Sequence, residues 1–409
     1  MLKTIPTSQV KLGMHVEELK GAWVDHPFWK SKFVIKDPSD LKKLQQSVIK
    51  EVVIDISKGL DVVETAAATP AQPQQAVTSQ LQKINSAPKI AVKRITASQE
   101  RKQAKLAIAA SRKAVVSMFS DVRMGKAINA EGLAPLVNQI SASLDRNEGA
   151  LISLVRLKSS DDYTYMHSVA VCALMVSLGR QLELSEIEIK QAGLAGLLHD
   201  VGKAAIPAEV LNKPGALTAE EFNLVKRHPE LGYELLLKGQ VKDEIALDVC
   251  LHHHEKIDGS GYPHKLNGDQ ISLFAKMGAV CDVYDAVTSN RPYKAGWDPG
   301  TSLHTMAQWK NHFDENVFKA FVKSVGIYPI GTMVMLKSSR LGVVIDQSPQ
   351  NLLTPIVKVF FSTKSKIRIP TEVVDLSKPA TKDQIVGHED PRKWGIDDVD
   401  DLWNQNDLW

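Results

Sequence analysis

The sequence has little of several features that would point to particular classes of protein. Its three cysteines, Cys172, Cys250 and Cys281, all fall within apolar helical patterns, which argues against a disulfide framework and favours buried thiols in a reducing compartment. No apolar run reaches the roughly 18 residues that a membrane-spanning helix needs, and the first residues lack the apolar segment of a signal peptide. We therefore expect a cytoplasmic protein without membrane insertion.

The chain also carries little net charge. A formal charge of +3 on 409 residues argues against general nucleic-acid binding, so any basic patch must be local. The hydrophobic content of 44% and the charged content of 24% are those of an ordinary globular protein. Because the chain is too long for one hydrophobic core, we expect two or three domains.

The first 64 residues have the pattern of a small α/β domain. Short β-rich runs at residues 11–16, 32–35 and 51–56 flank apolar positions at helical spacing in residues 41–49. Aromatic side chains supply most of the apolar area that so small a domain can bury, so closure of the core is favoured over a binding site. The side chains concerned are Trp23, His26, Phe28 and Trp29.

The rest of the chain changes character three times. Residues 65–97 are rich in Ala, Thr, Pro and Gln, which predicts a flexible linker. Residues 98–327 show helical periodicity, and residues 328–380 show short β runs separated by polar turns. Residues 381–409 form an acidic tail with tryptophans, for which an irregular solvated segment is favoured over a docking peptide. The predicted fold is therefore mainly α, with small domains at both ends.

Side chains of the kinds that bind metals are distributed over about five helices of the central region. His167 shares a stripe with Val171, Leu174 and Leu178, so it faces the core. A single core histidine would mean little, but here buried carboxylates accompany several histidines. Burying an isolated carboxylate costs several kcal/mol unless it is paired or metal-bound, and a divalent cation favours both carboxylate and neutral imidazole. The pattern predicts a metal site without cysteine ligands, which argues against structural zinc.

Four motifs of this region resemble the HD-GYP family of bacterial cyclic di-GMP phosphodiesterases. They are HDVGK (199–203), HHE (253–255), DGSGYP (258–263) and DVYDAVTSNRPYK (282–294), and the resemblance covers about residues 125–325. The N-terminal region, with Gly13-Met14, residues 23–28 and residues 54–59, also resembles a domain of unknown function often fused ahead of HD-GYP domains. The resemblance implies an HD-type all-α bundle, which we expect to be active as residues 125–325 alone.

The resemblance also implies a pair of divalent metal ions bridged by Asp200. Tyr163 and Ala208 stand where three-metal members have ligands, so two metals are predicted, with His167 as a ligand or as a residue behind the ligands. Asp285 would orient a ligating imidazole. Iron or manganese is favoured, with nickel, zinc and magnesium as alternatives. The implied ligands are His167, His199, Asp200, His228, His253, His254 and Asp282.

Further residues are implied to handle the substrate. Lys203, one turn after the ligand pair, would stabilise charge during the reaction, although a surface lysine at a helix end is the plain alternative. Arg291 and Lys294 would grip phosphate, and Lys256 stands where the family more often has arginine, so its role is open. The loop residues Gly261, Tyr262 and Pro263 are implied in guanine binding and in contacts with diguanylate-cyclase (GGDEF) domains.

The implied reaction is hydrolysis of cyclic di-GMP to linear pGpG by a metal-bridging hydroxide, with further hydrolysis to GMP left open. Two alternatives remain at this point: a phosphodiesterase for another cyclic dinucleotide, and a non-catalytic cyclic di-GMP receptor or adaptor. A homodimer is also left open.

Overall fold

A computed structural model provides the structure of the chain. The structure describes residues 2–20, 32–35, 37–45, 47, 49–60, 94–157, 163–213, 215–289, 296–348 and 351–404. Packing divides the chain into two compact units, Met1–Lys93 and Arg94–Trp409. The aromatic residues between 23 and 29 and the predicted linker up to residue 93 lie outside the described residues, so both predictions stay predictions.

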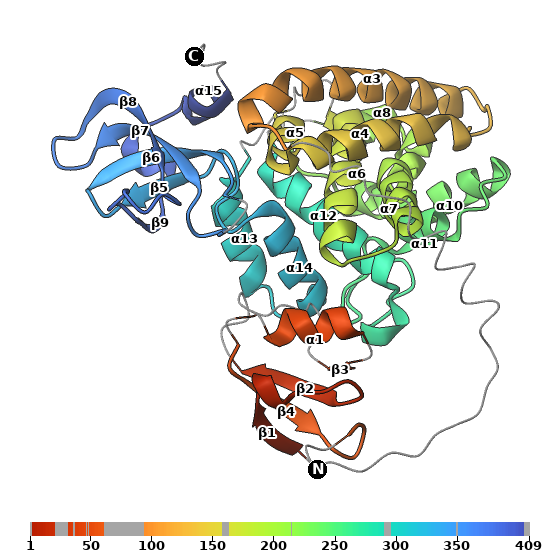
Figure 1. Ribbon diagram of the computed structural model, residues 1–409. Helices are drawn as coiled ribbons and strands as arrows, with labels where there is room; N and C mark the ends of the chain where they lie inside the picture. Colours follow the sequence, from red (N-terminus) through yellow and green to blue (C-terminus); the bar gives the residue numbers. More distant parts are fainter. Residues whose placement is uncertain are drawn as a thin grey trace. The chain divides into compact units, whose positions relative to one another are not determined.

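The first unit is a small antiparallel sheet with one helix. Its strands are β1 (Leu2–Pro6), β2 (His15–Lys20), β3 (Phe33–Val34) and β4 (Glu51–Asp55), in the order β1-β4-β2-β3. Helix α1 (Pro38–Gln45) follows β3 (Figure 1). The side chains of Ile35, Leu44 and Ile54 lie in the core. The sequence pattern did not predict β1, because only one of its side chains, Ile5, is buried.

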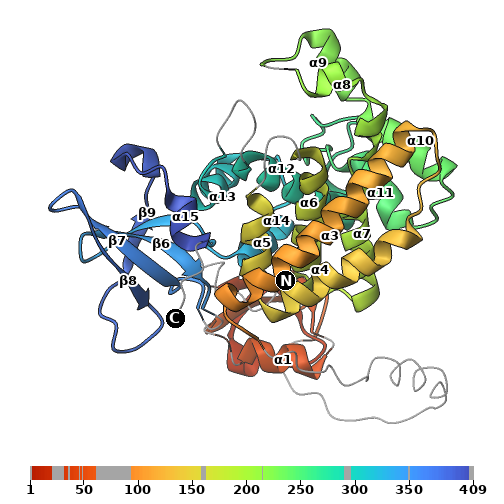
Figure 2. The same cartoon turned by 90° about the horizontal axis from the view of Figure 1, so that it is seen from above.

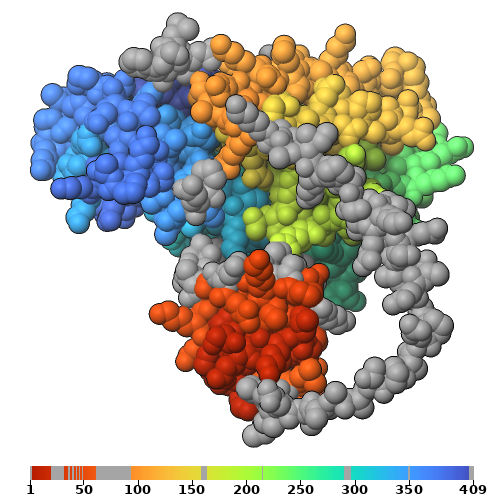
Figure 3. All heavy atoms as spheres, viewed as in Figure 1, coloured from red at the N-terminus to blue at the C-terminus, as the bar shows by residue number. Residues whose placement is uncertain are grey.

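Helix α6 (Tyr163–Gln181) is the centre of the second unit. It packs against α3 (Ala97–Arg123), α4 (Ala134–Arg146), α5 (Glu148–Arg156) and α7 (Glu186–Leu198). Residues 166–179 of α6 are all buried, because neighbours cover it on every side (Figure 2). A helix that is apolar all round is stable only in such a place. By contrast, α3 has exposed side chains along the surface of this unit, where it is orange in Figure 3.

The remaining helices complete the bundle. They are α8 (Ala208–Leu211), α9 (Ala219–Val225), α10 (His228–Lys238), α11 (Glu244–His252), α12 (Leu273–Thr288), α13 (Pro299–Gln308) and α14 (Glu315–Val325). Capping boxes at Ser185 and Thr218 open α7 and α9. Although residues 219–228 could form one helix, α9 ends at Val225 and His228 opens α10.

A five-stranded antiparallel sheet follows the helices, in the order β8-β7-β6-β5-β9. Its core is continuous with the helical part, because Ala97 and Ala150 pack in the same apolar cluster as Phe360 and Trp403. The strands are β5 (Met333–Leu336), β6 (Arg340–Asp346), β7 (Ile356–Ser362), β8 (Ile367–Asp375) and β9 (Ile385–His388).

The prediction of an irregular solvated tail was wrong for the described part of residues 381–409. Strand β9 pairs with β5, and helix α15 (Val399–Asn404) carries Trp403, which is 1% exposed. The indole N–H of Trp403 donates to Asp400 Oδ1 at 3.0 Å, and Arg156 pairs with the same carboxylate at 3.1 Å. The acidic residues that suggested solvation therefore help to fix the tryptophan.

The structure therefore confirms the predicted mainly helical fold, with a small sheet toward each end of the chain. The three cysteines are free and buried, as expected. Within the described ranges, no helix combines the length and apolar character that crossing a bilayer requires.

Candidate metal centre

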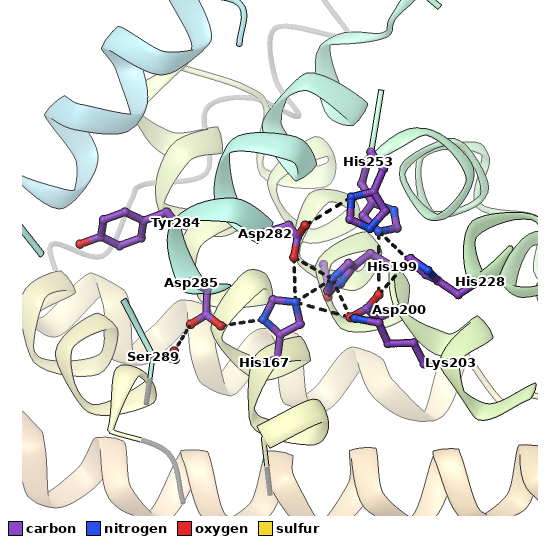
Figure 4. A network of polar contacts seen from close by, with 12 residues as sticks. His167, His199, Asp200, Lys203, His228, His253, Asp282, Tyr284, Asp285 and Ser289 are labelled. Atoms are coloured by element: carbon purple, nitrogen blue, oxygen red, sulfur yellow. Dashed lines mark hydrogen bonds and ion pairs between the residues drawn. The ribbon is translucent and has the colours of Figure 1, made fainter. Parts of the chain in front are cut away.

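Five helices deliver imidazoles and carboxylates to one place in the bundle (Figure 4). Most of these side chains stand at helix ends, where the chain turns and a side chain can point along the helix axis into the space between helices. The short helices α8 and α9 interrupt the series and contribute no ligand. The residues are His167 of α6, His199 and Asp200 after α7, His228 at the start of α10, His253 and His254 after α11, and Asp282 of α12.

Backbone carbonyls fix the tautomer of three of these histidines. A carbonyl oxygen only accepts hydrogen bonds, so the Nδ1 that contacts it must carry the proton, and Nε2 then keeps its lone pair. Each lone pair is directed into the site, as in metal-binding histidines whose other nitrogen is held by the protein. The pairs are His199 Nδ1 to Gly196 O at 2.8 Å, His228 Nδ1 to Val225 O at 2.8 Å and His253 Nδ1 to Val249 O at 3.0 Å.

The Nε2 atoms are spaced as if a cation lay between them. His228 Nε2 and His253 Nε2 are 3.2 Å apart, and neither carries a proton in the neutral tautomer, so two lone pairs face each other. His167 Nε2 and His199 Nε2 are 3.3 Å apart. Metal–nitrogen bonds of about 2.0–2.1 Å place neighbouring ligand atoms roughly 3.1–3.4 Å apart. A bound cation would therefore turn this repulsion into attraction without moving the side chains.

Asp200 lies between two groups of potential ligands. Its Oδ1 is 3.2 Å from His228 Nε2, and its Oδ2 is 3.5 Å from the Nε2 atoms of both His167 and His199. The side chain is 1% exposed, and Oδ1 has no hydrogen-bond partner among the described residues. An unsatisfied carboxylate oxygen this deep in a protein is costly unless an ion binds it.

The other potential ligands form two groups of three, and Asp200 approaches a histidine of each. In each group, one potential ligand atom per residue lies within 4.8 Å of the others. The first group has two imidazoles and a carboxylate, and the second has three imidazoles with Asp200 Oδ1 3.2 Å from His228 Nε2. Neither group contains a thiolate, so the residues present fit a pair of divalent ions. The groups are His167, His199 and Asp282, and His228, His253 and His254.

Comparison with known proteins agrees with this geometry. The HD domain family matches residues 144–317, and a domain of unknown function (DUF3391) matches residues 2–133. The cyclic di-GMP phosphodiesterase PA4108 of Pseudomonas aeruginosa is 53% identical over 404 residues, which cover 98% of this chain and 96% of that protein. The chain belongs to the HD-GYP family of bacterial cyclic di-GMP phosphodiesterases.

Two other similar HD-GYP relatives match only part of their length. The cyclic di-GMP phosphodiesterase response regulator RpfG of Xanthomonas campestris pv. campestris is 45% identical over 148 residues, 36% of this chain and 39% of that protein. The 3'3'-cGAMP-specific phosphodiesterase 2 of Vibrio cholerae serotype O1 is 35% identical over 176 residues, 42% of this chain and 33% of that protein. The relatives of this chain thus carry different named substrates.

Electrostatics keep four of the potential ligands, Asp200, Asp282, His253 and His254, in the form that a metal ion requires. Burial raises the pKa of Asp200 and Asp282, but nearby cationic groups and histidines outweigh it and hold both pKa values well below the usual range. Burial lowers the pKa of His253 well below its usual value and that of His254 to about 3. Carboxylates are therefore charged and these imidazoles neutral at neutral pH, as cation binding requires.

His167 differs from the other histidines of this HD-GYP site. Burial lowers its pKa, but the carboxylates of Asp282 and Asp285 outweigh burial and raise it. Its Nδ1 donates to Asp285 Oδ2 at 2.6 Å, and its Nε2 lies 2.9 Å from Asp282 Oδ1. Asp285 thus lies where a residue that orients the His167 imidazole is expected.

Lys203 and His254 mark the side of the HD-GYP site that faces solvent. Their side chains are 23% and 22% exposed, whereas those of His199 and Asp200 are almost completely buried. The Lys203 ammonium contacts Asp200 Oδ2 directly. A phosphate that approaches from this side would meet the lysine and the ligands together.

The GYP loop of the motif lies against the same side. The Tyr262 ring stacks on the His254 ring with centroids 4.7 Å apart, and the Tyr262 N–H donates to the His254 carbonyl at 3.2 Å. A Cβ on Gly261 would lie 2.5 Å from Glu255 Cα, so only glycine allows this approach, and Pro263 follows. The predicted phosphate ligands Arg291 and Lys294 lie outside the described residues.

The sequence did not reveal the role of Glu255. This carboxylate is buried and accepts the N–H of His264 at 2.7 Å and that of Leu266 at 3.0 Å, so it anchors the GYP loop next to the ligands. Its place directly after His253 and His254 was a signal in the sequence, but this signal does not distinguish a metal ligand from a residue that anchors a loop.

Proposed function

We propose that this protein is a metal-dependent phosphodiesterase that hydrolyses cyclic di-GMP to linear pGpG. The observation that supports the proposal most is that two groups of potential ligands, rich in imidazole, lie with the Asp200 carboxylate between them. The likeness to the cyclic di-GMP phosphodiesterase of Pseudomonas aeruginosa over almost the whole of both chains supports the choice of substrate. The proposed function requires both the metal pair and a phosphodiester at the exposed side of the site.

The ligand set favours iron or manganese, because imidazole with carboxylate suits these ions, with nickel, zinc and magnesium as alternatives. When bound, two divalent cations supply Lewis acidity toward the phosphate and lower the pKa of a water molecule that attacks it in line. His167, His199 and Asp282 would hold one ion, and His228, His253 and His254 the other. Asp200 would touch both.

The protein's own residues would orient the phosphodiester. Lys203 reaches the exposed side of the site, where its ammonium would stabilise the charge that develops on the phosphoryl oxygens. Attack of water on phosphorus breaks the bond to the ribose 3′ oxygen, which leaves a 5′ phosphate and a free 3′ hydroxyl. Tyr262, stacked on His254, would cover one wall and exclude water from it.

Two further predictions concern partners. We propose contact of the GYP loop with GGDEF domain proteins, and a homodimer remains a second proposal. The receptor alternative is disfavoured, because the side chains predicted as ligands belong to groups that could hold metal ions.

A phosphodiesterase for another cyclic dinucleotide is the second candidate. The relative from Vibrio cholerae with 35% identity, named for 3'3'-cGAMP, favours keeping it. Purine choice depends on contacts outside the metal ligands, so the ligand set is compatible with either substrate.

The test is turnover by protein stripped with a chelator and reloaded with manganese or, under anaerobic conditions, with iron. We expect two metal ions per chain and conversion of cyclic di-GMP to pGpG, followed by mass spectrometry, with slower turnover of 3'3'-cGAMP and cyclic di-AMP. Asp200→Asn should lose metal and activity, while His304→Gln, a change at an exposed histidine, should keep both. Metal-loaded protein that leaves cyclic di-GMP intact would refute the proposal.

A further inference from the structure

Lys226 lies against two aromatic rings from different parts of the chain. Its ammonium nitrogen is 4.7 Å from the ring centroid of Phe222, in α9, and 5.4 Å from that of Tyr262, in the GYP loop. Tyr262 in turn stacks on His254. Helix α9, which carries Phe222, stands with α8 at the edge of the bundle next to α10 (Figure 2). These contacts join the rim of the bundle to a metal ligand.

Within the part of the chain that the structure describes, the Lys226 ammonium has neither an acidic partner nor a hydrogen bond, although the backbone N–H of this residue donates to Phe222 O. The faces of the two rings stabilise the ammonium instead, by cation–π attraction. Its three N–H donors are therefore available to a ligand. The Phe222 side chain is 48% exposed, so an aromatic face is available beside them.

We propose that Phe222, Lys226 and Tyr262 form a purine subsite in which Lys226 donates to O6 and N7 of one guanine. This inference rests on the proposed function and names the residues that select the base. Guanine presents two acceptors on this edge, whereas adenine presents N7 and an amino group that repels an ammonium. Aromatic faces add stacking, which does not distinguish the bases.

The position suits a substrate held by its phosphate at the metals. The His254 and Tyr262 centroids are 4.7 Å apart and Tyr262 and Lys226 are 5.4 Å apart, so Lys226 lies within about 10 Å of the His254 ring. That span is comparable to one nucleotide, from its phosphate to the edge of its base. A subsite here therefore reads the nucleotide whose phosphate is cleaved.

A simpler explanation accounts for only half of the arrangement. Phe222 and Lys226 are four residues apart, and such pairs often do no more than stabilise a helix. The contact with Tyr262 is not needed for that, because it comes from a loop that covers a metal ligand. A second phosphate could also attract Lys226, but phosphate recognition gives no reason for the exposed Phe222 face beside it.

The decisive variant is Lys226→Met, which keeps an unbranched apolar stem and removes the charge and the donors. Arg227→Ala is the matched control, because it removes an exposed charge from the next position. Steady-state kinetics on manganese-loaded protein would use cyclic di-GMP as substrate, cyclic di-AMP as competitive inhibitor and bis(4-nitrophenyl) phosphate as a substrate without a base. Calorimetric binding of cyclic di-GMP to calcium-loaded protein provides a measurement independent of turnover.

We expect Lys226→Met to lower kcat/KM for cyclic di-GMP by roughly 5-fold to 100-fold, the range of one good contact to a base edge. The inhibition constant of cyclic di-AMP and the turnover of bis(4-nitrophenyl) phosphate should stay within about twofold, as should every value for Arg227→Ala. Phe222→Ala should weaken both dinucleotides, because stacking is not base-specific.

Equal losses for cyclic di-GMP and cyclic di-AMP would show a phosphate contact and overturn the inference. A loss on bis(4-nitrophenyl) phosphate would also overturn it, by showing that Lys226 serves the metal centre. If the wild-type protein binds cyclic di-GMP without hydrolysing it, the proposed function fails, while weaker binding by Lys226→Met alone would still support the subsite. Equal binding by wild type and variant would refute the subsite itself.

Discussion

Contacts of single atoms decide which nitrogen of each histidine can bind a cation. His167 depends on Asp285, whose Oδ2 accepts from its Nδ1 at 2.6 Å and leaves Nε2 directed toward Asp200 and Asp282. Asp285 is held in turn by the hydroxyl of Ser289, which donates to Oδ1 at 3.4 Å. The hydrogen bond between His167 and Asp285 is therefore short, and the one between Asp285 and Ser289, further from His199 and Asp200, is long and weak.

Asp285→Asn should therefore lower metal affinity or kcat about 10-fold to 100-fold with the fold retained, as for other residues that orient metal-binding histidines. Ser289→Ala is the matched control and should change both by less than about threefold, because the 3.4 Å contact is weak. Metal titration and steady-state kinetics measure the two effects. Equal losses in the two variants would contradict the role given to Asp285.

The pKa shifts predict how the stability of metal-free protein depends on pH. Burial, the largest cause, lowers the pKa of His199, His253 and His254, so below about pH 6.5 the unfolded chain takes up protons that the folded chain does not. The contribution of these three neutral imidazoles to the free energy of unfolding is therefore complete above about pH 6.5 and is lost as the pH falls. His167, whose pKa is raised, acts in the opposite direction, but it is one group against three.

We therefore expect the free energy of unfolding without metal to fall by roughly 2 kcal/mol between pH 7 and pH 5.5. Urea unfolding in the presence of a chelator would measure it. His253→Gln should flatten the slope, because glutamine does not titrate. Stability that rises toward pH 5.5 would show that His167 dominates.

The kinds of side chain at the site were predictable from the sequence, but their geometry was not. His167 and Asp282 stand on apolar stripes, which is sufficient to place them inward. The free nitrogen of each imidazole depends on carbonyls such as Gly196 O and Val225 O, and their positions exist only in the folded chain. Glu255 shows the same limit. The sequence does not indicate whether this buried carboxylate binds a metal ion or anchors a loop.

At the scale of elements, the site depends on how closely the segment after α7 approaches α10. The 3-10 turn η5 (Val201–Ala205) follows Asp200 directly, and α10 begins with His228. A Cβ on Gly202 would overlap the carbonyl oxygen of His228 and lie 2.5 Å from Gly232 N. The atoms that the Cβ would meet all belong to the backbone, so the clash cannot be relieved by a change of side-chain conformation.

Gly202→Ala should therefore destabilise the protein by about 3 kcal/mol or more and separate Asp200 from His228, with loss of metal. The control is Gly387→Ala in β9, where an added Cβ would meet no atom within 4 Å, and its effect should be below about 1 kcal/mol. Thermal unfolding and metal content measure both variants. A stable Gly202→Ala protein with full metal content would show that η5 and α10 can move apart.

Element boundaries were predictable where a local signal existed. The capping boxes at Ser185 and Thr218 involve neighbouring residues, so their side chains alone predict where α7 and α9 start. The break between α9 and α10 has no Gly or Pro before His228, and Lys226 and Arg227 keep helical backbone angles. Strand β9 was missed because its pairing with β5 connects residues about 50 positions apart.

The second unit behaves as one body because its helices and its C-terminal sheet share a core. Ala97 of α3, Ile330 and Trp403 lie in one apolar cluster with the strands. Helix α3 also buries Val115 and Phe119 against the bundle, and its Glu100 pairs with Arg146 at 2.6 Å. The expectation that residues 125–325 suffice for activity does not take these contacts into account, because they are not visible as a pattern in that stretch.

Residues 94–409 should keep the metal content and the thermal transition of the second unit in the full-length chain, whereas residues 125–325 should lack a cooperative transition. The shorter fragment loses α3, whose large buried side chains are each worth roughly 1.5–3 kcal/mol, and their sum is comparable to the roughly 5–15 kcal/mol of a whole domain. The fragment also lacks Ile330, which packs against Gly149 of α5, and Glu100, which pairs with Arg146. Calorimetry and elemental analysis of both fragments test this. A folded 125–325 fragment with two bound metals and full turnover would mean that α3 and the sheet serve a purpose other than holding the site together.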